Sequence, residues 1–362
     1  MDGGDKGLKS PLFRVMNKRT KKKIQTECCA KSKEDDMIKR NLIKRVMAAG
    51  AIMAVTLSLA GCGISGSSVK LGAAGVGGGY YAFSNAFAQI ASEENEDLDF
   101  EVKVTAGSTA NIRLLSDGYV DMAIAQADLV DAAYNGTGAT DKKRYRGYSA
   151  VASLYTEACQ IVVRVDSGID SLDDLQGKKV SVGEEESGTQ RNAEQILKMT
   201  GLVESLVDTV NLDYVDAANE LKSGQIDAFF CTAGIQTSVI EELSKECAVK
   251  LIGIDDKCRD RLKSVYGFYT DYTIPAGTYE GQDQDVETLG VRAVLLARDD
   301  MDEEIVEKLT GLLFEHSQDI QYSIPLTFQI DESEAVKNVT IPFHDGAKAY
   351  YQKKGIEIPA EQ

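Results

Sequence analysis

Residues 69–91, VKLGAAGVGGGYYAFSNAFAQIA, are the stretch that decides the fold. The apolar run Val69–Ala74 is typical of a buried strand, residues 75–79 are glycine-rich, and the apolar spacing from about Tyr81 through Ala91 predicts an amphipathic helix. Glycines at a strand-to-helix junction let backbone N–H groups approach an anion, which the positive end of the helix dipole also favours. A nucleotide site is disfavoured, because no Gly-Lys-Ser/Thr follows and the G-x-G-x-x-G spacing is absent. A tight turn without a ligand is the other alternative.

The same alternation of β-rich and amphipathic stretches continues along the chain and predicts parallel sheets flanked by helices. We expect further strands at 100–105, 122–125, 150–154, 160–165, 179–182, 210–214, 228–231, 250–254 and 289–297. We expect further helices after 107–108 and over 129–134, 190–199, 217–222, 236–243, 303–317 and 346–354. The pattern therefore indicates an α/β protein, and the long strand at 289–297 is suited to crossing between two lobes.

Composition sets limits on the class of protein. The chain has 362 residues, 43% hydrophobic content and a net charge of −17, which suggest two globular domains and exclude global disorder. An acidic balance also argues against nucleic acid as a partner, since phosphate contacts require clustered Lys and Arg. Adsorption to an anionic lipid surface is disfavoured for the same reason.

The first 61 residues have the pattern of an export signal rather than of a folded domain. They hold 14 Lys and Arg against 6 Asp and Glu, and the uncharged run Val46–Ala60 follows the last basic pair. Residues 59–62, LAGC, resemble a bacterial lipobox, which implies cleavage before an acylated Cys62 and attachment to the lipid bilayer. An uncleaved anchor helix is the alternative. Because Met37 would start a signal of conventional length, we predict it as the true initiator.

Removal of residues 1–61 would leave 26 basic and 51 acidic residues and a net charge of −25. Residues 62–68 form a short tether in this interpretation. Four cysteines remain beyond Cys62, namely Cys159, Cys231, Cys247 and Cys258, without a C-x-x-C motif. Export permits a disulfide between Cys247 and Cys258, but buried free thiols fit the sequence equally well.

Two further strand-to-helix junctions combine glycine with hydroxyl side chains. These are Ala106–Asn111, AGSTAN, and Glu186–Gln190, ESGTQ. Ser and Thr at such positions either cap the helix or turn hydroxyl and amide groups toward a ligand. Because ligands of open α/β sheets collect at the carboxyl ends of the strands, three such junctions together favour a binding site.

Catalytic and metal-binding patterns are weak. The chain has two histidines, His316 on an expected helix and His344 before Asp-Gly-Ala, and it has neither H-E-x-x-H nor G-x-S-x-G. The acidic runs 184–186 and 299–304 lack the spacing of a calcium loop. We therefore expect no enzyme, no metal and no cofactor; a surface hydrolase that uses His344 as a base remains the alternative.

Eight elements in the same order resemble the TAXI family, the solute-binding proteins of TRAP transporters, over about Val69 to Ile356. The matching segments are Ala74–Tyr81, Gly107–Leu115, Gln126–Asp128, Leu154–Glu157, Gly183–Thr189, Gly224–Thr237, Ile274–Asp283 and His344–Ala347. The chain departs from the family pattern at Gly75 and Val76, where Ser and Thr are usual, at Thr156, where proline is usual, and at Glu186, where glycine is usual.

The resemblance implies a type II periplasmic-binding-protein fold in which two α/β lobes close on a ligand. Lobe I would comprise residues 69–158 and 288–362, and lobe II residues 159–287. The ligand would be a small organic anion, either a glutamate-like amino acid or a dicarboxylate, handed to TRAP membrane permease subunits on the outer face of the cell membrane. The implied ligand-binding residues are Gly78, Tyr80, Tyr81, Ser108, Asn111, Gln126, Ser187, Gly188, Thr189, Thr232, Gly234 and Tyr279.

Two alternative functions are consistent with part of the same sequence pattern. A binding protein of an ABC importer would have the same fold and a different membrane partner. A purely adhesive or immunogenic lipoprotein would have the same anchor and no small ligand.

Overall fold

The computed structural model describes residues 67–95, 98–138, 142–203, 205–324 and 330–359. Residues 1–61, Met37 and the acylation site Cys62 lie outside these ranges, so the expectations for them stay predictions. Within the described ranges, no helix combines the length and the apolar character needed to cross a bilayer.

The first lobe begins with the strand–glycine–helix unit that the sequence predicts. Strand β1 (Ser67–Gly72) leads through the glycine loop to helix α2 (Gly79–Glu94). Strand β2 (Leu98–Lys103) and strand β3 (Met122–Gln126) both pair in parallel with β1, with helix α3 (Ser108–Ser116) between them and helix α4 (Ala127–Asn135) after β3. The carboxyl ends of the three strands therefore lie at one edge, where the loops to α2, α3 and α4 begin.

The second lobe repeats the arrangement in the middle of the chain. Parallel strands β5 (Lys179–Ser181), β6 (Asp208–Val210) and β7 (Ala228–Ala233) alternate with helices α5 (Gly188–Thr200) and α6 (Tyr214–Ser223). Helix α7 (Ser238–Glu246) and strand β8 (Val249–Leu251) follow. The short 3-10 helices η2 (Val165–Ser167) and η3 (Leu172–Leu175) lie before β5.

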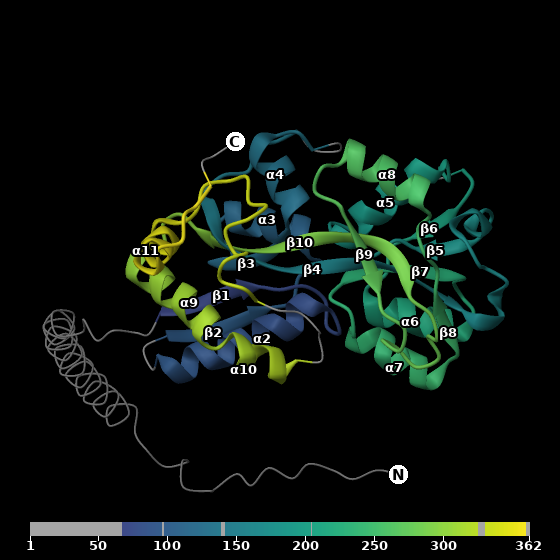
Figure 1. The fold of residues 1–362 in the computed structure, drawn as a ribbon, viewed down its shortest axis with the longest axis horizontal. Helices are drawn as coiled ribbons and strands as arrows, with labels where there is room; N and C mark the ends of the chain where they lie inside the picture. The colour runs from purple at the N-terminus through teal and green to yellow at the C-terminus, as the bar shows by residue number, and fades with distance from the viewer. Residues whose placement is uncertain (1–66, 96–97, 139–141, 204, 325–329, 360–362) are drawn as a thin grey trace, which may run out of the picture. The chain divides into compact units, whose positions relative to one another are not determined.

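Two long antiparallel strands join the lobes (Figure 1). Strand β4 (Tyr148–Arg164) pairs with β10 (Val286–Arg298) in the first lobe and with β7 in the second, so the main path of the sheet is β2-β1-β3-β10-β4-β7-β5-β6. The expectation of two separate strands at 150–154 and 160–165 was wrong. The expected parallel pairing holds within each lobe, but β4 and β10 add antiparallel pairs, so the sheet is mixed. Residues 155–159, YTEAC, contain no turn residue and are buried apart from Thr156, so the strand runs on.

Helix α8 (Asp256–Val265) and strand β9 (Thr270–Ile274) were not expected. Charged residues dominate α8, and only Cys258, Arg259 and Leu262 are buried, so its apolar stripe is too narrow to predict a helix from the sequence. The helix expected over 303–317 is divided at His316 into α9 (Glu303–Glu315) and α10 (Ser317–Ser323), because the His316 backbone leaves the helical region.

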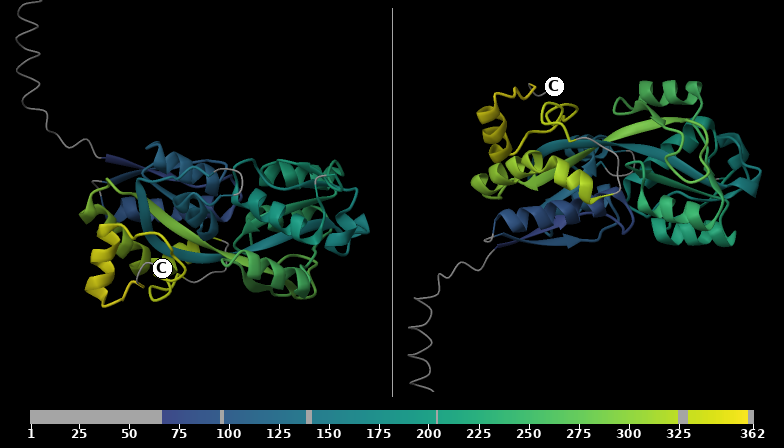
Figure 2. Two further views of the ribbon diagram at one scale, coloured as in Figure 1. Left: turned by 90° about the horizontal axis from the view of Figure 1, so that it is seen from above. Right: turned by 60° about the horizontal axis from the view of Figure 1, so that its bottom comes forward.

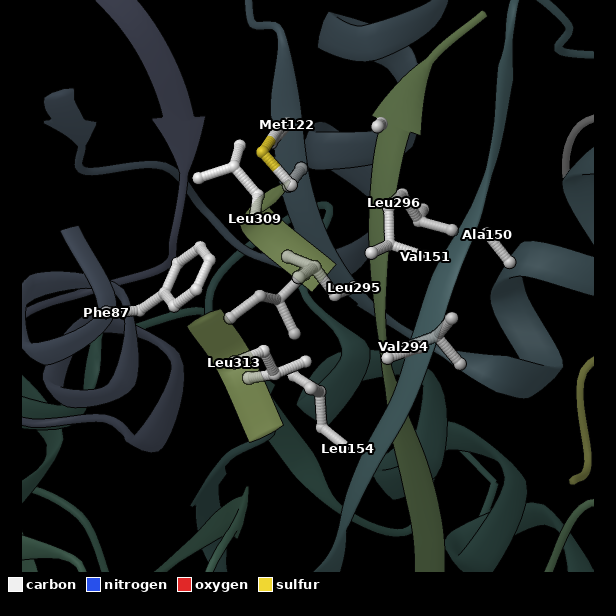
Figure 3. Packing of buried hydrophobic residues seen from close by; sticks show 14 of the residues in the cluster. Phe87, Met122, Ala150, Val151, Leu154, Val294, Leu295, Leu296, Leu309 and Leu313 are labelled. Carbon is white, nitrogen blue, oxygen red and sulfur yellow. The ribbon is translucent and has the colours of Figure 1, made fainter. Parts of the chain in front are cut away.

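Each lobe has its own hydrophobic core. The first core combines residues from 69–155 with residues from 293–351, including α9 and the last helix, α11 (Asp345–Lys354), which Figure 2 shows beside the first lobe. Figure 3 shows Phe87, Leu295, Leu309 and Leu313 gathered in this core. The cores of the second lobe draw on residues 158–291, so the chain leaves and re-enters the first lobe through β4 and β10. Lobe boundaries at 158/159 and 287/288 stay a prediction.

Candidate functional site

A small cavity lies where the glycine junctions of the two lobes meet, with a volume of about 40 Å³, room for a few water molecules. Its walls come from the loops after β1, β2, β5 and β6 and the helix starts that follow them, from the last residue of β3, from β7 and from the centre of β4. The lining residues are Ala74, Gly75, Gly78, Gly79, Tyr80, Ala106, Gly107, Ser108, Gln126, Glu157, Glu184, Ser187, Gly188, Thr189, Asp213, Tyr214 and Thr232.

The second lobe contributes the start of helix α5 and a cluster of hydroxyl groups. Ser187 is the N-cap of α5, and its Oγ accepts a hydrogen bond from the Gln190 backbone N–H at 2.9 Å. Thr189 Oγ1 lies 2.6 Å from Tyr214 Oη and accepts from the Thr232 backbone N–H at 3.2 Å. Since the first N–H groups of a helix have no acceptor within it, Gly188 and Thr189 present N–H donors at this end of α5.

The first lobe contributes the starts of helices α2 and α3 and a buried hydroxyl pair. Tyr80, in the first turn of α2, brings its Oη within 3.5 Å of Ser108 Oγ, and Ser108 Oγ accepts from the Gln126 backbone N–H at 3.1 Å. Gly107 adopts φ 120°, where a side chain is strained, and a Cβ there would lie 3.5 Å from the Ser187 Cα. The backbone conformation at 107 thus favours glycine, whereas a Cβ there would make only an ordinary contact with the second lobe.

Glu157 also lines the cavity, although it is not among the ligand-binding residues predicted from the sequence. It lies at the centre of β4, is 2% exposed, and its Oε2 accepts a hydrogen bond from Tyr80 Oη at 2.6 Å. Burial raises the pKa of its carboxyl to about 8, against hydrogen bonds from Tyr80 and Gln126 that lower the pKa. At neutral pH Glu157 is therefore mainly in its protonated form. The sequence signal that could have identified Glu157 is the match of Leu154–Glu157 to an element of the TAXI pattern.

Two more carboxyl side chains, Glu184 and Asp213, lie in the cavity wall. Partial burial, and Asp213 nearby, raise the pKa of Glu184. Of the described residues that line the cavity, none is Lys or Arg. The site thus combines acidic side chains with helix N-termini, an arrangement that provides both negative and positive electrostatic potential.

The lobes are in direct contact around the cavity. A Cβ at Gly188 would lie 2.5 Å from the Gln126 side-chain Cδ, so a larger residue there would require the end of the Gln126 side chain to shift. Gln126 Nε2 donates to Asn192 Oδ1 of α5 at 3.0 Å. The Glu186 backbone oxygen accepts from the Thr109 and Ala110 N–H groups at 3.1 and 3.2 Å, which places it on the N-terminus of α3. This is a closed arrangement of the two lobes.

Eight of the twelve sequence-predicted ligand residues line the cavity, and four do not. The eight are Gly78, Tyr80, Ser108, Gln126, Ser187, Gly188, Thr189 and Thr232. Tyr81 instead lines a neighbouring groove against α6 and α7. The Tyr279 hydroxyl binds Gln160 and the Thr237 N–H, and the Gly234 oxygen accepts from the Thr237 hydroxyl. Ligand contact by all twelve stays a prediction.

Asn111 is also outside the cavity lining, and its side chain is engaged within the sheet. Its Nδ2 donates to the backbone oxygens of Ala73 and Ile124, and its Oδ1 accepts from Thr105 Oγ1 at 2.7 Å. Asn111 therefore ties together the ends of β1, β2 and β3, which carry the cavity loops.

His344 lies apart from the cavity lining. Its Nδ1 accepts from the Gly346 N–H at 3.1 Å and so caps α11, and burial lowers the pKa of its imidazole. The four described cysteines, Cys159, Cys231, Cys247 and Cys258, are free thiols. Among the residues that the structure describes, no group of three or more His, Cys, Asp or Glu side chains is placed to hold a metal ion.

Comparison with solved structures identifies the fold. MatC from Rhodopseudomonas palustris, solved with bound malate, aligns with a TM-score of 0.51 at 15% identity, over 74% of this chain and 91% of that one. A Bordetella bronchiseptica protein aligns with a TM-score of 0.53 at 15% identity, over 80% and 98% of the two chains. A structure described as a periplasmic transporter aligns with a TM-score of 0.50 at 13% identity, over 81% and 98%.

These likenesses show the type II periplasmic-binding-protein fold, two α/β lobes with a cleft between them, as the sequence resemblance implied. Comparison with protein families gives a match to the NMT1-like family over residues 71–355, which include every described element from α2 to α11. The match thus covers both lobes and all the residues that line the cavity. The chain belongs to the NMT1-like family.

Proposed function

We propose that this protein is an extracytoplasmic solute-binding lipoprotein of a TRAP-type secondary transporter, which captures a small organic acid and delivers it to membrane permease subunits. The observation that carries the proposal is the convergence of the starts of α2, α3 and α5 on one cavity between two lobes. Helix N-termini are ready binding sites for a carboxylate. The eight ordered sequence elements support the TRAP assignment.

In this mechanism, a carboxylate of the ligand binds the N–H groups of Gly188 and Thr189 in the second lobe. Tyr80 and Ser108 of the first lobe then add their hydroxyl groups as the lobes close. A cavity of about 40 Å³ is smaller than a four-carbon acid, so the lobes must separate to admit the ligand. Binding would shift an equilibrium between open and closed states, because only the closed state offers both walls.

A thermal-shift assay on the chain from Ser65, which retains both hydrophobic cores, tests the proposal. A panel of amino acids and carboxylic acids, malate included, is expected to contain at least one compound that stabilises the protein. Ligand at a hundred times its Kd contributes about 2.7 kcal/mol, which raises Tm by a few degrees. Gly188→Asp is expected to remove the response, because an added carboxylate at the start of α5 would repel the carboxylate of the ligand. A flat response across the panel would contradict solute capture.

A binding protein of an ABC importer is the alternative, since the fold serves either partner. Genes for multi-span membrane subunits beside this one support the TRAP proposal, whereas a neighbouring ATPase gene supports the alternative. The hydrolase alternative depends on His344. If His344→Ala abolished turnover of an ester by the purified protein, that alternative would replace solute capture.

A further inference from the structure

We propose that Glu157 recognises a protonated amine of the ligand, so that the cavity accepts an amino acid and rejects an otherwise identical acid without the amine. This inference rests on the proposed function and narrows the class of ligand that the same cavity takes. The juxtaposition that carries it is a buried carboxyl group facing two helix N-termini across a cavity without a Lys or Arg side chain in its described lining.

The charges of the cavity wall oppose a dicarboxylate. Glu184 and Asp213 line the cavity, and a second ligand carboxylate would lie beside them with no Lys or Arg in the described lining to pair with. Arg113 of α3 and Arg191 of α5 line a different hollow beside the cavity. Arg113 is paired there with Glu186, and Arg191 with Glu194.

The free backbone N–H groups at the cavity are enough to bind one ligand carboxylate rather than two. The α3 N-terminus is already capped, since the N–H groups of Thr109 and Ala110 donate to the Glu186 backbone oxygen. The starts of α2 and α5 remain, at Gly79–Tyr80 and Gly188–Thr189, and both line the cavity from opposite lobes. A carboxylate between them would satisfy N–H donors of both lobes at once, which is how closure would be stabilised.

The position of Glu157 suits an ammonium ion. Tyr80 Oη donates to one carboxyl oxygen, Oε2, at 2.6 Å and so holds the carboxyl plane in place. A buried carboxylate is costly without a cation or several donors, and the raised pKa of the Glu157 carboxyl reflects that cost. An ammonium group from the ligand would supply both a positive charge and N–H donors, and would leave no buried charge unpaired.

Binding of an amino acid to Glu157 would release one proton from the protein to solvent. The amino acid arrives with its amine protonated, Glu157 loses its carboxyl proton to solvent, and an ammonium–carboxylate pair forms. The titratable groups that face Glu157 are Tyr80, Asp128, Tyr155, Cys159, Tyr214 and Cys231. Burial raises the pKa of each of them, so at pH 7 the tyrosines and thiols stay neutral and Glu157 is the proton donor.

Isothermal titration calorimetry on the mature protein tests the inference. The titrants are the standard L-amino acids and their amine-free counterparts, such as glutamate with glutarate and aspartate with succinate. Titrations at pH 7 in buffers with different ionisation enthalpies give the number of protons released. We expect an amino acid to bind at least tenfold more tightly than its amine-free counterpart and to release close to one proton.

Glu157→Gln keeps the shape of the side chain and an acceptor for Tyr80, but it cannot carry charge. Losing one charge-assisted hydrogen bond weakens binding by about tenfold to a hundredfold. We expect that loss for the amino acid, together with loss of proton release, and little change for the amine-free acid. The control is Glu304→Gln, an exposed residue of α9 outside the cavity lining, which should bind like the wild type.

The outcomes separate this inference from the proposed function. If an amine-free acid binds the wild type as tightly as its amino-acid counterpart, or if Glu157→Gln retains full affinity and proton release, the role of Glu157 is overturned while solute capture stands. If no compound of either series binds, solute capture is overturned, and this inference with it. Retained proton release in a folded Glu157→Gln variant would mean that another group releases the proton, which also overturns the role of Glu157.

Discussion

Arg113 of helix α3 and Glu186 of the loop before α5 form a two-point ion pair between the lobes. Arg113 Nε donates to Glu186 Oε1 at 3.1 Å, and Nη2 donates to Oε2 at 2.7 Å. Glu186 has φ 64°, in the left-handed region where the TAXI pattern has glycine. A non-glycine residue in this conformation carries backbone strain of about 1 kcal/mol or more, which the ion pair and the two N–H contacts to its backbone oxygen offset.

Arg113→Ala should shift the unliganded protein toward the open state. Both side chains are about two-fifths exposed, so the pair contributes about 0.2–1 kcal/mol, a factor of up to about five in the open–closed ratio. Small-angle scattering or a fluorescence distance between the lobes measures this ratio. High salt should reduce the difference between wild type and variant, because exposed charges are screened.

The exchanged pair Arg113→Glu with Glu186→Arg is the control for that prediction. It should recover much of the closed population, whereas each single charge reversal should favour the open state. Equal open populations in the wild type and in Arg113→Ala would mean that the ion pair has no influence on closure.

Gly188→Ala should prevent full closure without unfolding the second lobe. The added Cβ would lie 2.5 Å from Gln126 Cδ of the other lobe, and Gln126 is held by Asn192. We expect thermal stability without ligand within about 0.5 kcal/mol of the wild type and ligand affinity at least tenfold lower. Gly267→Ala, where a Cβ would meet nothing within 4 Å, is the matched control. Unchanged affinity in Gly188→Ala would contradict the closed geometry described above.

The stability of the unliganded protein should fall as pH rises from about 5 to about 8. The native state keeps a proton on Glu157 up to about pH 8, whereas the unfolded chain loses it near the ordinary value of 4.5, so the native state binds more protons in this window. The free energy of unfolding falls by up to about 1.4 kcal/mol per pH unit from this group. Asp128, whose pKa burial raises to about 6, adds to the fall at the acidic end.

Urea unfolding of the wild type and of Glu157→Gln across this pH range measures the effect. The difference between the two proteins isolates Glu157, since Asp128 and His344 titrate in both. The wild type should lose its advantage over the variant as pH rises. Parallel pH profiles would show that Glu157 is ionised in the unliganded protein.

Asn111→Asp should destabilise the first lobe rather than act on ligand binding alone. The variant would lose the Nδ2 donor and place a carboxylate beside the backbone oxygens of Ala73 and Ile124. We expect a loss of about 2–4 kcal/mol in the free energy of unfolding. If stability is unchanged and affinity falls, Asn111 acts on the ligand directly, as the sequence resemblance implied.

The local structure of the site loops was predictable because short-range patterns carry it. The apolar run 69–74 and the glycines after it produce β1 and the start of α2, and Ser187 before Gly188 produces an N-cap. That one strand, β4, continues without a turn between residues 154 and 160 was harder to foresee. Glu157 interrupts the apolar run there, and a charged residue inside a buried strand resembles a loop when its partners are unknown.

By itself, the sequence determined the alternation of strands and helices, the glycine junctions and the acidity of the chain, because each depends on residues near one another. Only the tertiary structure decided which groups face the cavity. Glu157 and Tyr80 are far apart in the chain yet share a hydrogen bond, and Asn111 points away from the cavity to bind the sheet ends. Ligand chemistry depends on such long-range pairings, since burial and neighbouring charges, which no local pattern encodes, set the charge that each group carries.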